Sequence, residues 1–129
     1  MTMVALEDDM FAVRIAPRVV AAAPDAWVVV DRTGQIRAVN TAAVRRTGWP
    51  RAELRHRQVD ELLPEDQRER HAELRTAYMV APVDRPMGQG LSIELLHRDG
   101  ALVPVEILLG VLEADDLYVV ATIRRRGSP

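Results

Sequence analysis

Residues 24–34 read Pro24-Asp25-Ala26-Trp27-Val28-Val29-Val30-Asp31-Arg32-Thr33-Gly34, and this stretch decides the fold. The run from Trp27 to Asp31 is rich in β-branched residues and predicts a strand. The four residues from Asp31 to Gly34 predict a turn, because glycine adopts a positive φ without steric cost. Residues 35–39 are then expected to return as a second strand beside the first.

A capped helix is expected next, in the sequence Ala38-Val39-Asn40-Thr41-Ala42-Ala43. Asn40 has the side chain of an N-cap, so the pattern predicts a helix over Thr41–Thr47 that ends at Gly48. Residues 49–54 and 59–63 are expected to form short helical pieces. Pro64 is tolerated in the first turn of a helix, and it precedes one that we expect to run to about Met79.

The last third of the chain predicts three strands. Prolines and glycines within residues 82–90 indicate a loop. Strands are expected over 91–97 and 102–112, joined by the Asp99-Gly100 turn, and over 117–124 after an acidic turn. The order of helix, two strands, several helices and three strands is typical of an α+β fold, with an antiparallel sheet and helices on one side.

Both faces of this sheet are expected to be apolar. Successive residues of the 102–112 strand point to opposite faces of the sheet. One face carries Val105, Ile107, Leu109 and Val111, and the other carries Leu108 and Leu112. A sheet that is apolar on both faces needs two covers. The internal helices supply one, and a helical leader over residues 4–23, a second copy of the chain, or both are expected to supply the other.

The chain therefore divides into a flanking helix and dimerisation segment (1–23), one domain (24–126) and a tail (127–129). A length of 129 residues suits a single domain that buries a sizeable core. The formal net charge of −2 gives no global field that favours nucleic acid or an anionic membrane. No apolar run is long enough to span a bilayer.

The absence of cysteine excludes disulfides, cysteine-based zinc sites and thiol catalysis. A secretory signal would begin with basic residues, whereas this chain begins with the acidic cluster Glu7, Asp8 and Asp9. We therefore expect a cytoplasmic location.

A third motif, His97-Arg98-Asp99-Gly100-Ala101-Leu102-Val103-Pro104-Val105-Glu106-Ile107, completes the series begun by the two stretches above. In this order and spacing the three motifs resemble the PAS sensor domain over residues 22–125. The resemblance implies a PAS fold, a five-stranded antiparallel sheet in which the two N-terminal strands are central and the three C-terminal strands flank them. PAS domains detect signals or bind partners and seldom catalyse reactions. The resemblance therefore implies a sensory module, not an enzyme, with an output domain on the same or another chain.

His71 is the sharpest candidate for a functional residue. Gln67, His71, Leu74 and Tyr78 recur at helical spacing on one face, which Leu63 and Leu74 mark as inward. His71 is therefore expected to point toward the sheet, where PAS domains keep their pocket. A neutral imidazole there could ligate haem iron, hydrogen-bond a ligand or bond to a neighbouring residue. The candidate ligand-binding residues are His71, Leu74, Tyr78, Leu91, Ile107 and Leu109.

The segment from Pro64 to His71 is also similar to oxygen-sensing haem PAS domains. Their proximal histidine would fall at His71, and their apolar distal residues would fall at Ile107 and Leu109. The sequence departs from them at Leu91, where the distal arginine would fall, and at Ala77, where an arginine that steadies a haem propionate would fall. The cofactor is therefore unknown, with haem as one candidate. The alternative is a buried histidine that a neighbour satisfies.

The other polar and aromatic residues have simpler interpretations. His56 is expected on a solvated face, and His97 at a hairpin end. Trp27 is expected to cover the outer sheet face or a dimer partner, and Trp49 to pack as a hydrophobic staple. Most carboxylates fit caps or surface positions, Asp60 among them. No carboxylate pair in an apolar pocket, Ser-His-Asp pattern, phosphate loop or metal-ligand spacing is recognisable.

Three hypotheses follow. The first is a PAS module that senses a small ligand between the helix bearing His71 and the sheet face of Ile107 and Leu109. The second is a ligand-free PAS module that homodimerises or docks a partner through its N-terminal helix and outer sheet face. The third is a small α+β enzyme of isomerase type, which the early two-stranded hairpin disfavours.

Overall fold

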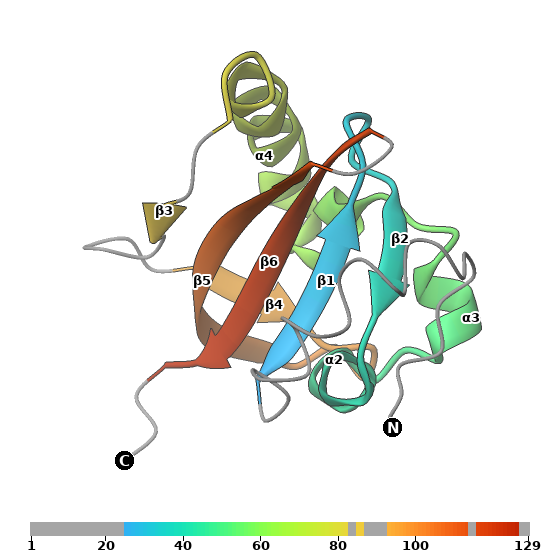
Figure 1. Cartoon of the computed structure of the whole chain (residues 1–129). Helices are drawn as coiled ribbons and strands as arrows, with labels where there is room; N and C mark the ends of the chain where they lie inside the picture. Colours follow the sequence, from blue (N-terminus) through green and yellow to red (C-terminus); the bar gives the residue numbers. More distant parts are fainter. Residues whose placement is uncertain (1–24, 83–84, 87–92, 114–115, 127–129) are drawn as a thin grey trace.

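The computed structural model describes residues 25–82, 85–86, 93–113 and 116–126. The leader helix expected at 4–23, the tail at 127–129 and Leu91 lie outside these ranges. The expected strands and helices are otherwise confirmed, with small differences at their ends. One short strand, Arg85–Pro86, lies where a loop was expected. In chain order the elements are β1 (Ala26–Val30), β2 (Ile36–Val39), α2 (Thr41–Thr47), α3 (Arg51–Leu54), the 3-10 helix η1 (Val59–Leu62), α4 (Glu65–Tyr78), β3 (Arg85–Pro86), β4 (Ile93–Leu96), β5 (Leu102–Glu113) and β6 (Leu117–Arg125) (Figure 1).

The described strands form one antiparallel sheet in the order β2-β1-β6-β5-β3, with β4 also beside β5. The strands β3 and β4 share the same edge of β5, because Pro86 lies opposite Leu108 and Ile93 lies opposite Val105. The two short strands therefore act as one edge of a sheet five strands wide, as expected.

The expectation that both N-terminal strands are central is wrong. Only β1 is central, between β2 and β6, and β2 lies at the edge of the sheet. Short connections place β4, β5 and β6 side by side as one group. This group pairs with only one edge of the β1–β2 hairpin, the edge formed by β1, so β2 is left at the edge of the sheet. The free edge of β2 is partly covered by the chain after α3, where the Ile36 N–H donates to the Arg57 carbonyl over 3.0 Å.

Both faces of the sheet carry buried apolar side chains, as the alternation predicted. The larger cluster, here called the inner cluster, joins one face to the helices through Ala42, Ala43, Leu54 and Leu62. The outer cluster lies on the opposite face and consists of Trp27, Val29, Ala38 and Tyr118, with Leu112 and Val120 packed against it. The described helices contribute no residue to the outer cluster.

Asn40 fixes the entry into α2 with three hydrogen bonds of its buried side chain. Its Oδ1 accepts from the backbone N–H of Ala43 over 3.0 Å, which is the predicted N-cap, and from that of Trp27 over 3.1 Å. Its Nδ2 donates to the Asp25 carbonyl over 3.0 Å. The side chain therefore ties the start of the helix to the start of β1.

Gly48 ends α2 in the left-handed region, with φ 79°. A Cβ at this position would lie 2.4 Å from Cε1 of His97, so the turn between β4 and β5 packs directly on the end of α2. The backbone of the same turn is bound as well, because the Arg98 N–H donates to the Thr47 carbonyl over 2.8 Å. Glycine is thus required both for its conformation and for this close approach.

Gly48→Ala is expected to lower the free energy of unfolding by more than Gly100→Ala. Both residues have positive φ, which costs an L-residue about 1–2 kcal/mol, but a Cβ at Gly100 would meet no atom within 4 Å. The additional loss of stability in Gly48→Ala measures the contact of the new Cβ with His97. Combining Gly48→Ala with His97→Ala should therefore recover part of that loss. Urea denaturation of the three variants measures this, and equal losses at the two glycines would contradict it.

Candidate functional site

The longest described helix, α4, has no buried residue of its own. Its sequence is mostly charged, with Glu65 and Asp66 in the first turn, where the helix dipole favours them. Two residues at its C-terminal end, Tyr78 and Met79, pack against the inner cluster. The helix therefore lacks the continuous apolar stripe that usually fastens a surface helix to its domain.

A polar cluster of Asp60, His71 and Arg75 fastens α4 instead, and we call it the Asp60 cluster. Asp60 belongs to η1 and is buried, with its side chain 11% exposed. Its Oδ1 lies 2.5 Å from Nδ1 of His71, and its Oδ2 accepts from Nη2 of Arg75 over 2.9 Å. Nε of Arg75 is 3.3 Å from Oδ1. One carboxylate thus holds two successive turns of the helix.

The charge of Asp60 is stabilised by its partners. Burial raises the pKa of the Asp60 carboxyl, but the hydrogen bonds from Arg75 and His71 outweigh burial and hold that pKa below its ordinary value. The carboxyl is therefore an anion near neutral pH and acts only as an acceptor.

The Asp60 cluster also reaches the turn between β1 and β2. Gly34 has φ 86° there, and a Cβ on it would lie 2.4 Å from Cζ of Arg75, so the guanidinium packs on the glycine backbone. A further bond, from Nε of Arg68 to the Leu63 carbonyl over 2.9 Å, holds the first half of α4. The helix is thus attached to η1 and to the β1–β2 turn mainly by arginine and histidine side chains.

The predicted ligand-binding residues do not all lie where the helical spacing placed them. His71 is half-buried, with its side chain 30% exposed. Tyr78, Ile107 and Leu109 are partly buried and pack against the inner cluster, as expected for an inward position. Leu74 is 57% exposed, so the expectation that it faces the sheet is wrong.

The error at Leu74 has a geometric cause. Successive residues of a helix are about 100° apart, so the inward side of α4 centres on Arg68, His71, Arg75 and Tyr78. Leu74 lies beyond the edge of that arc. An apolar residue suggested the inward direction, whereas the attachment of this helix is ionic.

The other two histidines and the two tryptophans make contacts that stabilise the fold or lie at the surface. His56 is exposed, as expected. Nδ1 of His97 accepts from the Asp99 N–H over 3.1 Å. Trp27 is buried in the outer cluster, and Trp49 packs on the inner cluster with the guanidinium carbons of Arg57 and Arg98 at 3.9 and 5.1 Å from its ring centre.

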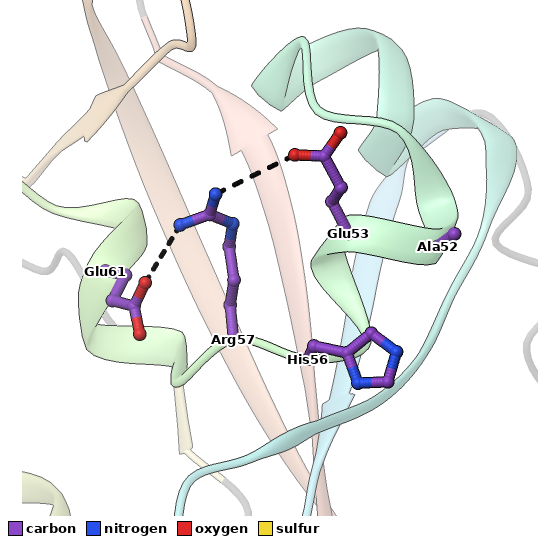
Figure 2. Close-up of a pocket in the computed structure, with 5 residues that line it drawn as sticks. All are labelled: Ala52, Glu53, His56, Arg57 and Glu61. Carbon is purple, nitrogen blue, oxygen red and sulfur yellow. Dashed lines mark hydrogen bonds and ion pairs between the residues drawn. The ribbon is translucent and has the colours of Figure 1, made fainter.

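A shallow hollow of about 420 Å³, which was not predicted from the sequence, lies between α3 and η1 (Figure 2). Arg57 bridges its two sides, with ion pairs of 3.8 Å to Glu53 and 2.9 Å to Glu61. Ala52 and His56 complete the lining. The single guanidinium of Arg57 therefore faces two carboxylates, and it balances the charge of only one of them. None of the six predicted ligand-binding residues lines it.

The described part of the chain contains no group of three or more His, Asp or Glu side chains that could hold a metal ion. Its helices include none that is long and apolar enough to cross a membrane.

Comparison with known proteins identifies the class. The PAS fold family matches residues 16–126, and the chain belongs to this family. Sensor protein FixL of Bradyrhizobium diazoefficiens is 32% identical over 91 residues, which cover 70% of this chain and 18% of FixL. The chain thus spans less than a fifth of that relative. The domain is a PAS sensory domain of the kind found in signalling proteins.

Solved structures share the fold at low sequence identity. The PAS domain of the fruit-fly ELK potassium channel has a TM-score of 0.71 and 16% identity, covering 92% of this chain and 98% of that domain. The PAS domain of the RpfR quorum-sensing receptor from Cronobacter turicensis, in complex with C12:0, has a TM-score of 0.60 and 14% identity. It covers 79% of this chain and 93% of that domain.

The haem candidate at His71 stays a prediction. Ala77, where a propionate-binding arginine would fall, is exposed, and its side chain has no polar group for a propionate. The function proposed below therefore does not include haem.

Asp60→Asn is expected to lower the free energy of unfolding at neutral pH by about 1–3 kcal/mol, because it removes a charged acceptor from Arg75 and His71. The pKa of Asp60 is lowered on folding, so its contribution is fully present above the ordinary value of 3.8. That contribution is lost as the pH falls through the lowered value. The difference between wild type and variant should therefore narrow in acid.

Denaturant unfolding across an acid pH series measures this difference. Glu69→Gln, at an exposed carboxylate of the same helix, serves as the control and should change stability little. A difference for Asp60→Asn that widens as the pH falls below the ordinary value would contradict the assignment.

Proposed function

We propose that this PAS domain detects a small apolar ligand in the space bounded by α4 and the inner face of β5, and relays its binding to an output domain or partner chain. His71 is the polar contact of the ligand, and Tyr78, Ile107 and Leu109 are its apolar contacts. The proposal depends mainly on how burial changes along the inner face of the sheet.

That face is fully buried at its centre and only partly buried further along β5. Val28 on β1 and Val105 on β5 are fully buried, whereas Ile107 and Leu109, further along β5, are only partly buried. Tyr78 is partly buried beside the same cluster. A small alkyl or flat molecule would complete the burial of these side chains, at about 25 cal/mol for each Å² of apolar surface covered.

The attachment of α4 supports a relay. A helix held by one polar cluster, and not by a buried stripe, has few contacts that a ligand must overcome in order to shift it. Arg75 packs on the β1–β2 turn, and Arg32 in that turn pairs with Asp116 at the start of β6 over 3.2 Å. A ligand with different affinities for two positions of α4 would therefore shift the population of arrangements at this turn.

The RpfR domain supports an alkyl chain as the ligand class, since that PAS domain is known in complex with C12:0. We therefore choose dodecanol and dodecanoate as probes. Native mass spectrometry of the protein as purified, followed by calorimetric titration of both probes, tests for a ligand directly.

Ile107→Trp is expected to weaken probe binding at least tenfold, because the larger side chain fills the half-open space that the ligand would occupy. Leu108→Trp is the matched control, since the neighbouring residue of β5 points to the opposite face and is 40% exposed. Binding should survive in the control. Mass spectra without a bound molecule, together with no binding of either probe, would reject the ligand-sensing proposal.

A second function is favoured by the outer face of the sheet. Its buried cluster involves none of the described helices, and Leu102 and Leu108 on the same face are 48% and 40% exposed. We propose that this face, together with the N-terminal segment 1–23, forms a homodimer, since exposed apolar surface of this kind marks interaction sites.

Leu102→Asp combined with Leu108→Asp should convert the dimer to a monomer, because two carboxylates would be buried without partners at the interface. Analytical ultracentrifugation measures the mass. Leu74→Asp, at an exposed leucine on α4, is the control and should leave the dimer intact. A wild-type monomer at high protein concentration would contradict the proposal.

A further inference from the structure

We infer that Asp60 fixes the proton of His71 on Nδ1, so that Nε2 is the unprotonated atom offered to the ligand, and that the ligand therefore presents a hydrogen-bond donor. This inference rests on the proposed function, in which His71 contacts the ligand. Asp60 then acts as a positioning residue that determines ligand class without touching the ligand.

The argument begins with the partners of the carboxylate. Arg75 is always protonated and only donates, and it binds Oδ2 of Asp60 over 2.9 Å. An ionised carboxylate has no proton to give, so the 2.5 Å contact between Oδ1 and Nδ1 of His71 requires the proton on the imidazole nitrogen. A neutral imidazole with Nδ1 protonated carries its lone pair on Nε2.

Nε2 is available for such a contact. Among the described residues the only partner that the structure gives His71 is Asp60, through Nδ1. The ring is 30% exposed, and it lies on the same side of α4 as Tyr78, which packs on the inner cluster near Ile107 and Leu109. A bound hydroxyl or N–H could therefore donate to Nε2, whereas a carbonyl oxygen would meet the lone pair.

His97, in the same domain, is expected to have the opposite tautomer. Its Nδ1 lies 3.1 Å from the backbone nitrogen of Asp99, and a backbone N–H always donates, so Nδ1 accepts. The same Nδ1 is 3.1 Å from Oδ1 of Asp99, but a neutral ring cannot donate there while it accepts from the backbone. A neutral His97 therefore carries its proton on Nε2, and the two histidines should differ in tautomer.

The first experiment determines these tautomers in the wild-type protein without any ligand. Two-dimensional NMR that correlates imidazole nitrogens with ring carbon-bound protons distinguishes the two neutral forms and the doubly protonated ring. At neutral pH we expect a protonated Nδ1 on His71 and a protonated Nε2 on His97. A His71 protonated on Nε2 alone, or on both nitrogens, would overturn the inference and leave the proposed function standing.

The second experiment reverses the tautomer with Asp60→Asn. Arg75 only donates, so the amide oxygen should take the place of Oδ2, which receives the shorter of the two Arg75 bonds (2.9 Å against 3.3 Å to Oδ1), and the amide nitrogen then faces His71. That nitrogen donates, so Nδ1 must accept and the proton moves to Nε2. The imidazole spectrum of the variant reports this change, and its backbone amide spectrum reports whether the domain is folded.

The ligand preference should disappear when the tautomer is reversed. Dodecanol and the methyl ketone of the same chain length are uncharged, and only the alcohol can donate. One neutral hydrogen bond corresponds to about fivefold in affinity, so the wild type should bind the alcohol about fivefold more tightly than the ketone. Asp60→Asn should lose that preference, because a protonated Nε2 donates to either oxygen.

The control is Asp99→Asn, which alters the carboxylate beside the half-buried His97 and should leave the preference unchanged. Equal affinities of alcohol and ketone in the wild type would overturn the inference about ligand class. If neither probe binds the wild type, the proposed function fails while the tautomer measurement still tests the role of Asp60. If Asp60→Asn does not fold, the wild-type spectrum and the wild-type preference decide the inference.

Discussion

The buried carboxylate of Asp60 is the interaction on which the arrangement of this domain's longest helix depends. Two donors from successive turns of α4 converge on it, and the Arg75 guanidinium continues to the glycine of the β1–β2 turn. Removing one partner of such a group leaves a buried charge unsatisfied, which costs more than the bond itself contributes. The helix, the 3-10 turn before it and the first hairpin are therefore coupled through a single side chain.

This ionic attachment has a consequence for function. The inner cluster joins the sheet to α2, α3 and η1, whereas α4 adds only the residues at its C-terminal end to that cluster. Moving the helix would leave the buried carboxylate without its partners, so the proposed relay needs a second position of α4 in which Asp60 is paired again. In the function proposed above, ligand contact at the inner face of β5 and movement of α4 occur in the same part of the domain.

The sequence allowed prediction of the features that depend on neighbouring residues. The Asp31–Gly34 turn, the Asn40 cap and the end of α2 at Gly48 follow from local conformational rules, and all three are confirmed. The position of β2 could not be obtained in this way, because strand order depends on which edge of the hairpin the C-terminal strands reach. That choice of edge depends on how the strands pack in three dimensions, which local sequence rules do not describe.

Asp60 was missed because it resembled the other carboxylates of a charged segment. Its burial depends on the packing of η1 against α4, which local sequence does not specify. One signal was present, since His71 and Arg75 are four residues apart on a helix without a strong apolar stripe. Two donors at that spacing require a common acceptor if they face inward. Leu74 was a poor guide to the inward direction because polar side chains, and not apolar ones, attach this helix.

Hydrogen exchange of α4 tests the central claim most directly. If Asp60 fastens the helix, Asp60→Ala should accelerate amide exchange within Glu65–Tyr78 by about ten- to a hundredfold, while amides of α2 keep their wild-type rates. Glu69→Ala should change neither helix. Unchanged protection of α4 in Asp60→Ala, or an equal loss of protection throughout the domain, would contradict the account.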